Sequence, residues 1–198
     1  GGGGGASKAD DDADHSPAPA TEQDWAALAG VVGRLRAKWL REGRMKKLVL
    51  SDKKIKIGDA GVAVLAKVLP QCPALTKMHL KRNEITDAGV ATLVQVLPQC
   101  AALRSLVLSY NQIGSSGALV LANVLSKCAA LSYLSLWENQ IGSSVKTKLS
   151  KMSDSVRNTN GKTIGIRIGD KSDDDDSSSG SDDDEESGSE EEEDDGDE

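Results

Sequence analysis

The sequence predicts an α/β fold in which short parallel strands and helices alternate along a solenoid. Three segments support this fold class, because they begin at Leu75, Leu103 and Leu131 and align without gaps at a period of 28 residues. Within each unit, leucines two positions apart indicate a short strand, and the following apolar residues have helical spacing. Glycines keep the same period at Gly61, Gly89 and Gly117. A repeat of this length indicates equivalent units that stack and bury one continuous core.

The N-terminal part of the chain has two segments of different composition. Residues 1–20 combine five Gly with Asp, Ser, Pro and Ala, and bury too little apolar surface to offset the entropy of ordering, so we expect a disordered leader. Residues 21–43 carry apolar residues three and four apart, which predicts one helix that caps the open end of the solenoid. The residues on this stripe are Trp25, Leu28, Val32, Leu35 and Trp39.

Residues 44–142 contain the repeats, about three and a half in number. In each one a pair such as Met78 and Leu80 predicts the strand, and a stretch such as residues 88–97 predicts the helix behind it. We expect the periodic glycines to serve the turns before the helices. Residues 143–169 predict a C-terminal cap, in which a short polar helix precedes a closing strand over residues 163–168.

Two further residue types recur once per repeat. Asn83, Asn111 and Asn139 each follow a predicted strand, where an amide can bond the backbone of a tight bend, so we expect a structural ladder of Asn side chains. The cysteines have neither the even number of a disulfide set nor the spacing of a metal site. We expect them to be buried thiols in a reducing compartment. They are Cys72, Cys100 and Cys128.

Each repeat reads L-x-x-[LM]-x-L-x-x-N-x-I, which resembles the leucine-rich repeat. A 28-residue unit with a full helix resembles the ribonuclease-inhibitor-like subclass, which includes nucleotide-binding receptors and Ran GTPase-activating proteins. The resemblance implies a horseshoe whose strands line a concave face, with the residues between the leucines pointing into solvent. It also implies a function in binding other proteins, since solenoids of this kind present extended concave surfaces to partners.

The concave face is the expected partner-binding site. Tyr, Trp and Arg are enriched at interface hot spots, and three of the five Tyr and Trp residues of the chain fall on this face. For some of these residues an alternative to partner binding stays open. Trp137 could instead cover the C-terminal end of the stack, and Lys81 and Arg82 could instead form only a solvated surface. The expected site residues are Lys77, His79, Lys81, Arg82, Tyr110, Tyr133, Trp137 and Glu138.

Charge is segregated along the chain, whose total is −7. Residues 170–198 carry 18 Asp and Glu against one Lys, which predicts a disordered acidic tail for capturing basic proteins. Residues 21–169 carry 22 Lys and Arg against nine Asp and Glu. Three serines precede acidic runs, the context favoured by acidophilic kinases such as casein kinase II, so we expect their phosphorylation. They are Ser172, Ser181 and Ser189.

These features favour a non-enzymatic protein-interaction module over other classes. The two histidines, His15 and His79, have no motif partner for nucleophilic or metal chemistry, so we expect no catalytic residue, metal or cofactor. We expect neither a membrane nor a nucleic-acid partner, because no long apolar run occurs and the basic residues form no compact motif. An alternative rests on the repeat-plus-acidic-tail layout, which resembles Ran GTPase-activating proteins and implies a GTPase activator or small-GTPase binder. The expected location is the cytoplasm, the nucleus or both.

Overall fold

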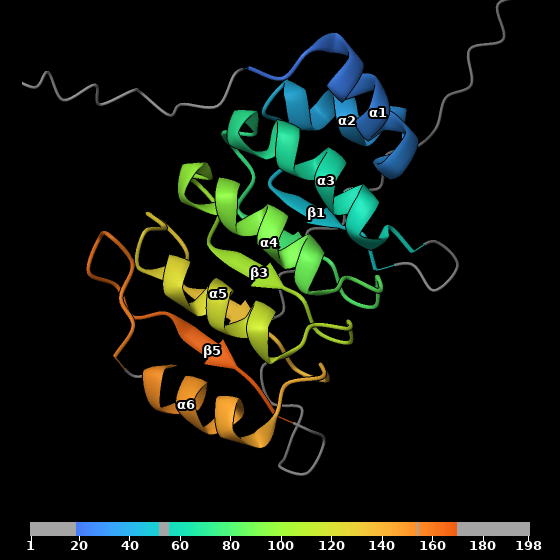
Figure 1. Cartoon of the computed structure of the whole chain (residues 1–198). Coiled ribbons are helices and arrows are strands. Elements are labelled where there is room, and N and C mark those ends of the chain that lie inside the picture. Colours follow the sequence, from blue (N-terminus) through green and yellow to red (C-terminus); the bar gives the residue numbers. More distant parts are fainter. Residues whose placement is uncertain (1–18, 52–55, 154, 170–198) are drawn as a thin grey trace, which may run out of the picture.

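The computed structural model describes residues 19–51, 56–153 and 155–169 of the 198-residue chain. Most of the predicted leader, the acidic tail and its three serines therefore lie outside the described residues. The elements, in chain order, are α1 (Glu22–Val32), α2 (Arg34–Arg41), β1 (Lys47–Val49), α3 (Gly58–Val68), β2 (Lys77–His79), α4 (Asp87–Val96), β3 (Ser105–Val107), α5 (Ser115–Leu125), β4 (Tyr133–Ser135), α6 (Ser143–Ser153) and β5 (Gly165–Arg167), with single 3-10 turns at Leu69–Gln71 and Leu97–Gln99. The strands form one layer, and helices α3 to α6 form a second layer along one face of it (Figure 1).

The five strands form one parallel sheet in chain order, β1-β2-β3-β4-β5. Equivalent positions pair along the sheet, so that Lys77 is opposite Ser105 and Ser105 is opposite Tyr133, 28 residues apart each time. The step from β1 to β2 is 30 residues, and the step from β4 to β5 is 32, as the pairs Lys47–Lys77 and Tyr133–Gly165 show. The fold class predicted from the sequence is confirmed. The stack is longer than predicted, because α6 and β5 continue it as a full strand-to-strand unit.

The core lies between the two layers and is made of stacked leucines and isoleucines. The central residue of each of the first four strands is fully buried, and both flanking positions are more exposed, except Ser135 in β4. Burying one such side chain contributes about 1.5–3 kcal/mol before the entropy of ordering is counted. These strand residues are Leu48, Met78, Leu106 and Leu134, and the facing helices contribute Leu65, Leu93, Leu121 and Leu149.

The N-terminal cap consists of two helices, so the prediction of a single helix over residues 21–43 is wrong. Gly33 has φ +89°, which other residues rarely adopt, and it ends α1 and begins α2. The break rotates the second helix, so Ala37 and Leu40 are buried while Leu35 is 57% exposed. The predicted apolar stripe therefore holds for Trp25, Leu28 and Val32 of α1 but does not continue through α2.

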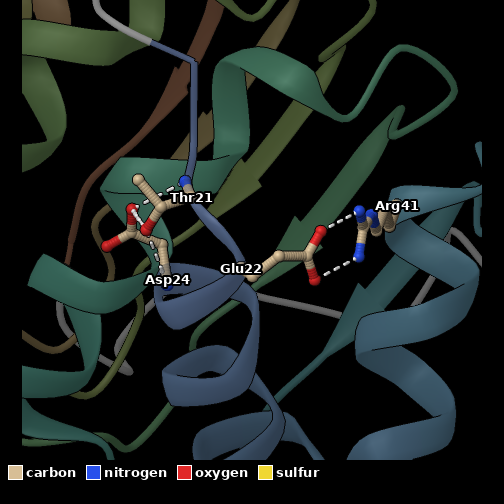
Figure 2. A network of polar contacts seen from close by, with 4 residues as sticks. All are labelled: Thr21, Glu22, Asp24 and Arg41. Atoms are coloured by element: carbon tan, nitrogen blue, oxygen red, sulfur yellow. Dashed lines mark hydrogen bonds and ion pairs between the residues drawn. The ribbon is translucent and has the colours of Figure 1, made fainter.

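Polar contacts fix the start of this cap (Figure 2). Thr21 and Asp24 form a capping box: the Asp24 N–H donates to Thr21 Oγ1, and the Thr21 N–H donates to Asp24 Oδ2. The bonds from the Thr21 backbone and hydroxyl, with Lys67 of α3 at 3.1 Å, lower the pKa of Asp24 to about 2. Arg41 of α2 binds both carboxylate oxygens of Glu22, which ties the two cap helices together.

The periodic glycines lie inside the helices rather than in the turns, which corrects the role predicted for them. Gly89 and Gly117 sit in the first turn of α4 and α5, and a Cβ on either would overlap the carboxylate of an Asp in the preceding helix. Asp59 accepts hydrogen bonds from the Thr86 N–H (2.9 Å) and hydroxyl (2.6 Å), and Asp87 accepts one from the Gly114 N–H (2.6 Å). Small residues are needed there because these carboxylates bridge successive helices.

Candidate protein-binding face

The open face of the sheet, defined here as the face opposite helices α3 to α6, carries the residues that flank the buried strand leucines. Position by position, Lys47, Lys77, Ser105 and Tyr133 form one row, and Val49, His79, Val107, Ser135 and Arg167 form the next. Lys77 is exposed, His79 is half-buried and Tyr133 is 37% exposed. Ser135 differs from the solvent-facing position predicted for it. It is buried, and its hydroxyl lies 2.7 Å from that of Ser109, which is also buried.

Each strand from β2 to β4 leads into a turn with a left-handed residue. Arg82, Tyr110 and Glu138 have φ of 62°, 56° and 53° at equivalent positions of successive repeats. Their N–H groups donate across the sheet to the carbonyls of Ser109 (3.1 Å), Trp137 (2.9 Å) and Gly169 (3.4 Å), respectively. A left-handed conformation costs free energy for residues other than Gly, Asn and Asp. The hydrogen bonds between repeats, and those of the Asn that follows each of these residues, stabilise it.

The three Asn side chains connect consecutive repeats. Asn111 Nδ2 donates to the carbonyls of Leu80 and Leu108, both at 2.9 Å, and its Oδ1 accepts from the N–H groups of Asn83 and Ile85. Asn139 Nδ2 makes the equivalent bonds to Leu108 and Leu136 at 2.9 Å, and Asn83 Nδ2 donates to Leu50. Without these amides, buried backbone N–H and C=O groups would have no hydrogen-bond partner. The Asn ladder therefore stabilises the turns that carry the residues of the open face.

The side chains beside this ladder form a cation–aromatic row that runs from the segments after β2, β3 and β4 to strand β5. Arg82 Cζ lies 4.7 Å and Lys81 Nζ 4.8 Å from the centroid of the Tyr110 ring. Tyr110 and Trp137 meet edge to face with centroids 4.9 Å apart, and Arg167 Cζ lies 5.5 Å from the Trp137 ring. We call these five residues the cation–aromatic row: Lys81, Arg82, Tyr110, Trp137 and Arg167.

Four of the expected site residues are therefore in mutual contact, and one member of the row was missed by sequence reasoning. Trp137 contacts both the aromatic neighbour and the closing strand, so it has features of both alternatives proposed for it. The sequence indicates for Arg167 only a place in the C-terminal cap. Apolar and polar residues alternate at Ile166, Arg167 and Ile168, and this alternation is the signal that could place Arg167 on the open face. Glu138 is half-buried at the turn position equivalent to Tyr110, and Tyr133 is on the adjacent row.

The open face is strongly basic at its N-terminal half. Among the described residues, 20 Lys and Arg stand against seven Asp and Glu, and those seven are mostly in the cap, at the helix starts and at the turns. Partial burial lowers the pKa of His79, and the nearby charges of Lys47 and Lys77 act in the same direction. No carboxylate of the described residues forms an ion pair with Lys77, Lys81 or Arg82.

The cysteines lie at equivalent positions, shortly after the C-terminal ends of helices α3, α4 and α5. Each Sγ–H donates to the carbonyl four residues earlier, at 3.3 Å for Cys72, 3.4 Å for Cys100 and 3.6 Å for Cys128. Burial raises the pKa of Cys72 and Cys100 to about 12 and that of Cys128 to about 11. A thiol with so high a pKa is a weak nucleophile and a poor metal ligand at neutral pH.

Metal-holding clusters and membrane-crossing helices are both absent from the described residues. In residues 19–51, 56–153 and 155–169 there is no cluster of three or more His, Cys, Asp and Glu side chains placed to hold a metal ion. No helix in that part of the chain has the length and apolar character needed to cross a membrane.

Comparison with known proteins agrees with the repeats seen in the structure. A family model described as "Leucine Rich repeat" matches residues 71–94 and 99–122. A comparison with curated proteins gives no match. Among solved structures, the chain is similar to one titled "Leiomodin-1 Actin-Binding Site 2 (ABS2)", with a TM-score of 0.57, 16% sequence identity, and coverage of 77% of this chain and 81% of that chain. The matched repeats and the parallel sheet of five strands together show that this chain folds as a short leucine-rich-repeat solenoid.

Proposed function

We propose that the chain is a non-enzymatic interaction module that binds a protein partner across its open face. The observation that carries this proposal is the cation–aromatic row, in which two cations, two rings and a third cation are in continuous contact from the segment after β2 to strand β5. Tyr, Trp and Arg are the residue types most enriched among those whose truncation costs the most binding energy.

The row is suited to binding because its rings are held by neighbouring side chains and stay partly accessible. Tyr110 and Trp137 are half-buried, and each ring contacts the other ring and at least one cation. Fixed rings lose little side-chain entropy when a partner binds, which preserves more of the interaction free energy. Lys81 and Arg82 have no carboxylate partner among the described residues, so they favour a partner with acidic groups.

The acidic residues 170–198 supply a second binding element in this proposal. Their charge of −17 attracts basic proteins and raises the rate of encounter, an effect that salt screens. Phosphorylation at Ser172, Ser181 and Ser189 would add about 1.5–2 negative charges per site at neutral pH and strengthen this attraction.

The proposal is tested by affinity capture from cell extract, compared between the intact chain and a variant with Arg82→Glu, Tyr110→Ala and Trp137→Ala. A matched control carries Lys127→Glu, Val120→Ala and Gln95→Ala, all exposed residues on the helix side of the molecule. Urea unfolding of each variant checks that it remains folded. Purified actin is included as a defined probe, since the similar solved structure is titled as an actin-binding site.

A protein that is lost with the face variant and kept by the control supports the open face as the binding site. A small GTPase with this behaviour favours the alternative of a GTPase regulator, which is then tested by the rate of GTP hydrolysis. Capture that is identical for all three chains contradicts the proposal. If the identical captures consist of basic proteins, the acidic residues 170–198 bind and the repeats serve as their anchor.

A further inference from the structure

The cations of the open face are arranged to accept carboxylates. In the part of the chain that the structure describes, Lys81, Arg82 and Arg167 lie over rings and pair with no carboxylate. A guanidinium stacked on a ring keeps the N–H donors in its own plane, which match the two oxygens of a carboxylate. Lys47 and Lys77 add positive charge on the adjacent row. The chemistry that fits this surface is therefore an extended acidic peptide.

The described chain ends at the edge of the same surface. Gly169, its last residue, accepts a hydrogen bond from the Glu138 N–H in the third of the left-handed turns. Arg167, two residues earlier, contacts Trp137 in the cation–aromatic row. The described part of the chain thus ends, at Gly169, beside the C-terminal end of that row. The residues that follow it in the sequence, 170–198, carry 18 Asp and Glu and one Lys.

The length of this segment is more than sufficient to cover the row. Parallel strands lie about 4.8 Å apart, so the distance from β5 to β2 is about 15 Å. The 29 residues from 170 to 198 span up to about 95 Å when fully extended. A short tether gives an effective concentration of the order of mM, so even a weak contact would be substantially occupied within one molecule.

We infer that residues 170–198 of this chain dock on its own open face along the cation–aromatic row. The inference rests on the proposed function, because it assigns a competitor to the same face. An acidic partner must displace residues 170–198 from the face, and a basic partner that binds these residues uncovers it. The described residues have a net charge of +13 against −17 for residues 170–198, which gives the contact its sign and its dependence on salt.

The test uses the full chain with Gly180→Cys, labelled with a nitroxide and studied by NMR. The three native thiols have pKa values of about 11–12, so at neutral pH the introduced thiol reacts selectively, and the unsubstituted chain treated in the same way is the control. In 50 mM salt we expect the label to broaden the amide signals of Arg82, Tyr110 and Trp137 at least threefold more than those of Val120 and Lys127. In 500 mM salt the broadening should disappear.

Two charge-reversed variants locate the contact. Arg82→Glu with Arg167→Glu should remove the broadening from the open face. Lys127→Glu with Lys148→Glu makes the same change in net charge on the helix side, where both lysines are exposed, and should preserve it. Equal broadening on both sides of the molecule, an equal loss in both variants, or no broadening at 50 mM salt would overturn the inference.

The label and the affinity capture together distinguish a failure of this inference from a failure of the proposed function. If the label shows no contact with the open face, and affinity capture still depends on Arg82, Tyr110 and Trp137, the inference fails while the proposed function stands. If the label contacts the face but capture does not depend on those residues, the acidic segment docks as inferred and the proposed function fails.

Discussion

Tyr110 and Trp137 contact each other through both their backbones and their rings. The Tyr110 N–H donates to the Trp137 carbonyl at 2.9 Å, and the two rings meet edge to face at 79° with centroids 4.9 Å apart. The left-handed φ of Tyr110 sets the direction of its side chain relative to its own N–H, and in this conformation both groups contact the same neighbouring residue. The surface proposed for binding is therefore also part of what joins one repeat to the next.

This double contact predicts that the two aromatic residues stabilise the fold in a coupled manner. Replacing Tyr110 and Trp137 by Ala, singly and together, should give a coupling free energy of about 0.5–1.5 kcal/mol, the range for an edge-to-face pair beyond its buried area. Urea unfolding of the four chains measures it. Additive effects would show that the ring contact contributes nothing to stability.

The Asn ladder predicts a larger loss at Asn111. Its amide is buried and bonds backbone groups of Leu80, Leu108, Asn83 and Ile85, so Asn111→Ala leaves several buried groups without partners. We expect a destabilisation of about 2–4 kcal/mol, because each orphaned group costs about 1–3 kcal/mol. Asn111→Asp, which keeps the acceptor and loses both donors, should not restore stability. Unfolding midpoints in urea, compared with Asn139→Ala in a less buried site, check this order.

The repeat architecture could be predicted because its signal is strictly periodic. Burial on one face of a strand sets the two-residue spacing of leucines such as Leu106 and Leu108. Pairing of equivalent positions in stacked units sets the 28-residue spacing from Leu106 to Leu134. The last strand was predicted as a closing strand, and it pairs with β4 in the same parallel register as the others. Its 32-residue step and its lack of the Leu and Asn signature hid it from the repeat count.

Other features depended on contacts that no local pattern contains. The stripe from Trp25 to Trp39 continues across Gly33 with helical spacing, and only the φ of that glycine separates the two helices. The role of Gly117 depends on a carboxylate 30 residues earlier in the chain. Arg167 joins the cation–aromatic row through the sheet pairing, which places it beside Trp137 from a different repeat.

The helix glycines predict opposite effects of the same substitution at two positions. Gly117→Ala should destabilise by about 1–3 kcal/mol, because the new methyl group overlaps the Asp87 carboxylate that holds the Gly114 N–H. Gly30→Ala in α1 meets nothing within 4 Å and should stabilise by about 0.5–1 kcal/mol. Thermal or urea unfolding of both chains measures the contrast. In an Asp87→Ala background the cost of Gly117→Ala should shrink, and an undiminished cost would contradict this steric cause.

The stacked thiols predict low reactivity in the folded chain. Because burial raises the pKa of Cys72, Cys100 and Cys128 to about 11–12, iodoacetamide at pH 8 should modify them at least tenfold more slowly in the folded chain than in urea. Mass spectrometry of the alkylated peptides reads each site separately. Cys72 and Cys128 are buried and Cys100 is half-buried, and fast modification at all three sites in the absence of urea would contradict the packing described for them.

His79 predicts how stability changes between about pH 5 and pH 7. Burial, with Lys47 and Lys77, lowers its pKa in the folded chain below the ordinary 6.5, so the unfolded chain binds more protons in this range. The contribution to stability is therefore fully present above pH 6.5 and is lost as the pH falls through the lower, folded-state pKa. Glu22 and Asp24 also have lowered pKa values, but the stability that they contribute is lost only in more acidic solutions, below their ordinary pKa values of 4.5 and 3.8.

Urea unfolding tests this prediction for His79. The difference in stability between pH 7.5 and pH 5.5 should be smaller for His79→Gln than for the intact chain, with His15→Gln as the control for the other histidine. An NMR titration checks the cause directly: the imidazole of His79 should titrate below pH 6.5 and move upward in Lys77→Gln, and a pKa at or above 6.5 would refute the prediction.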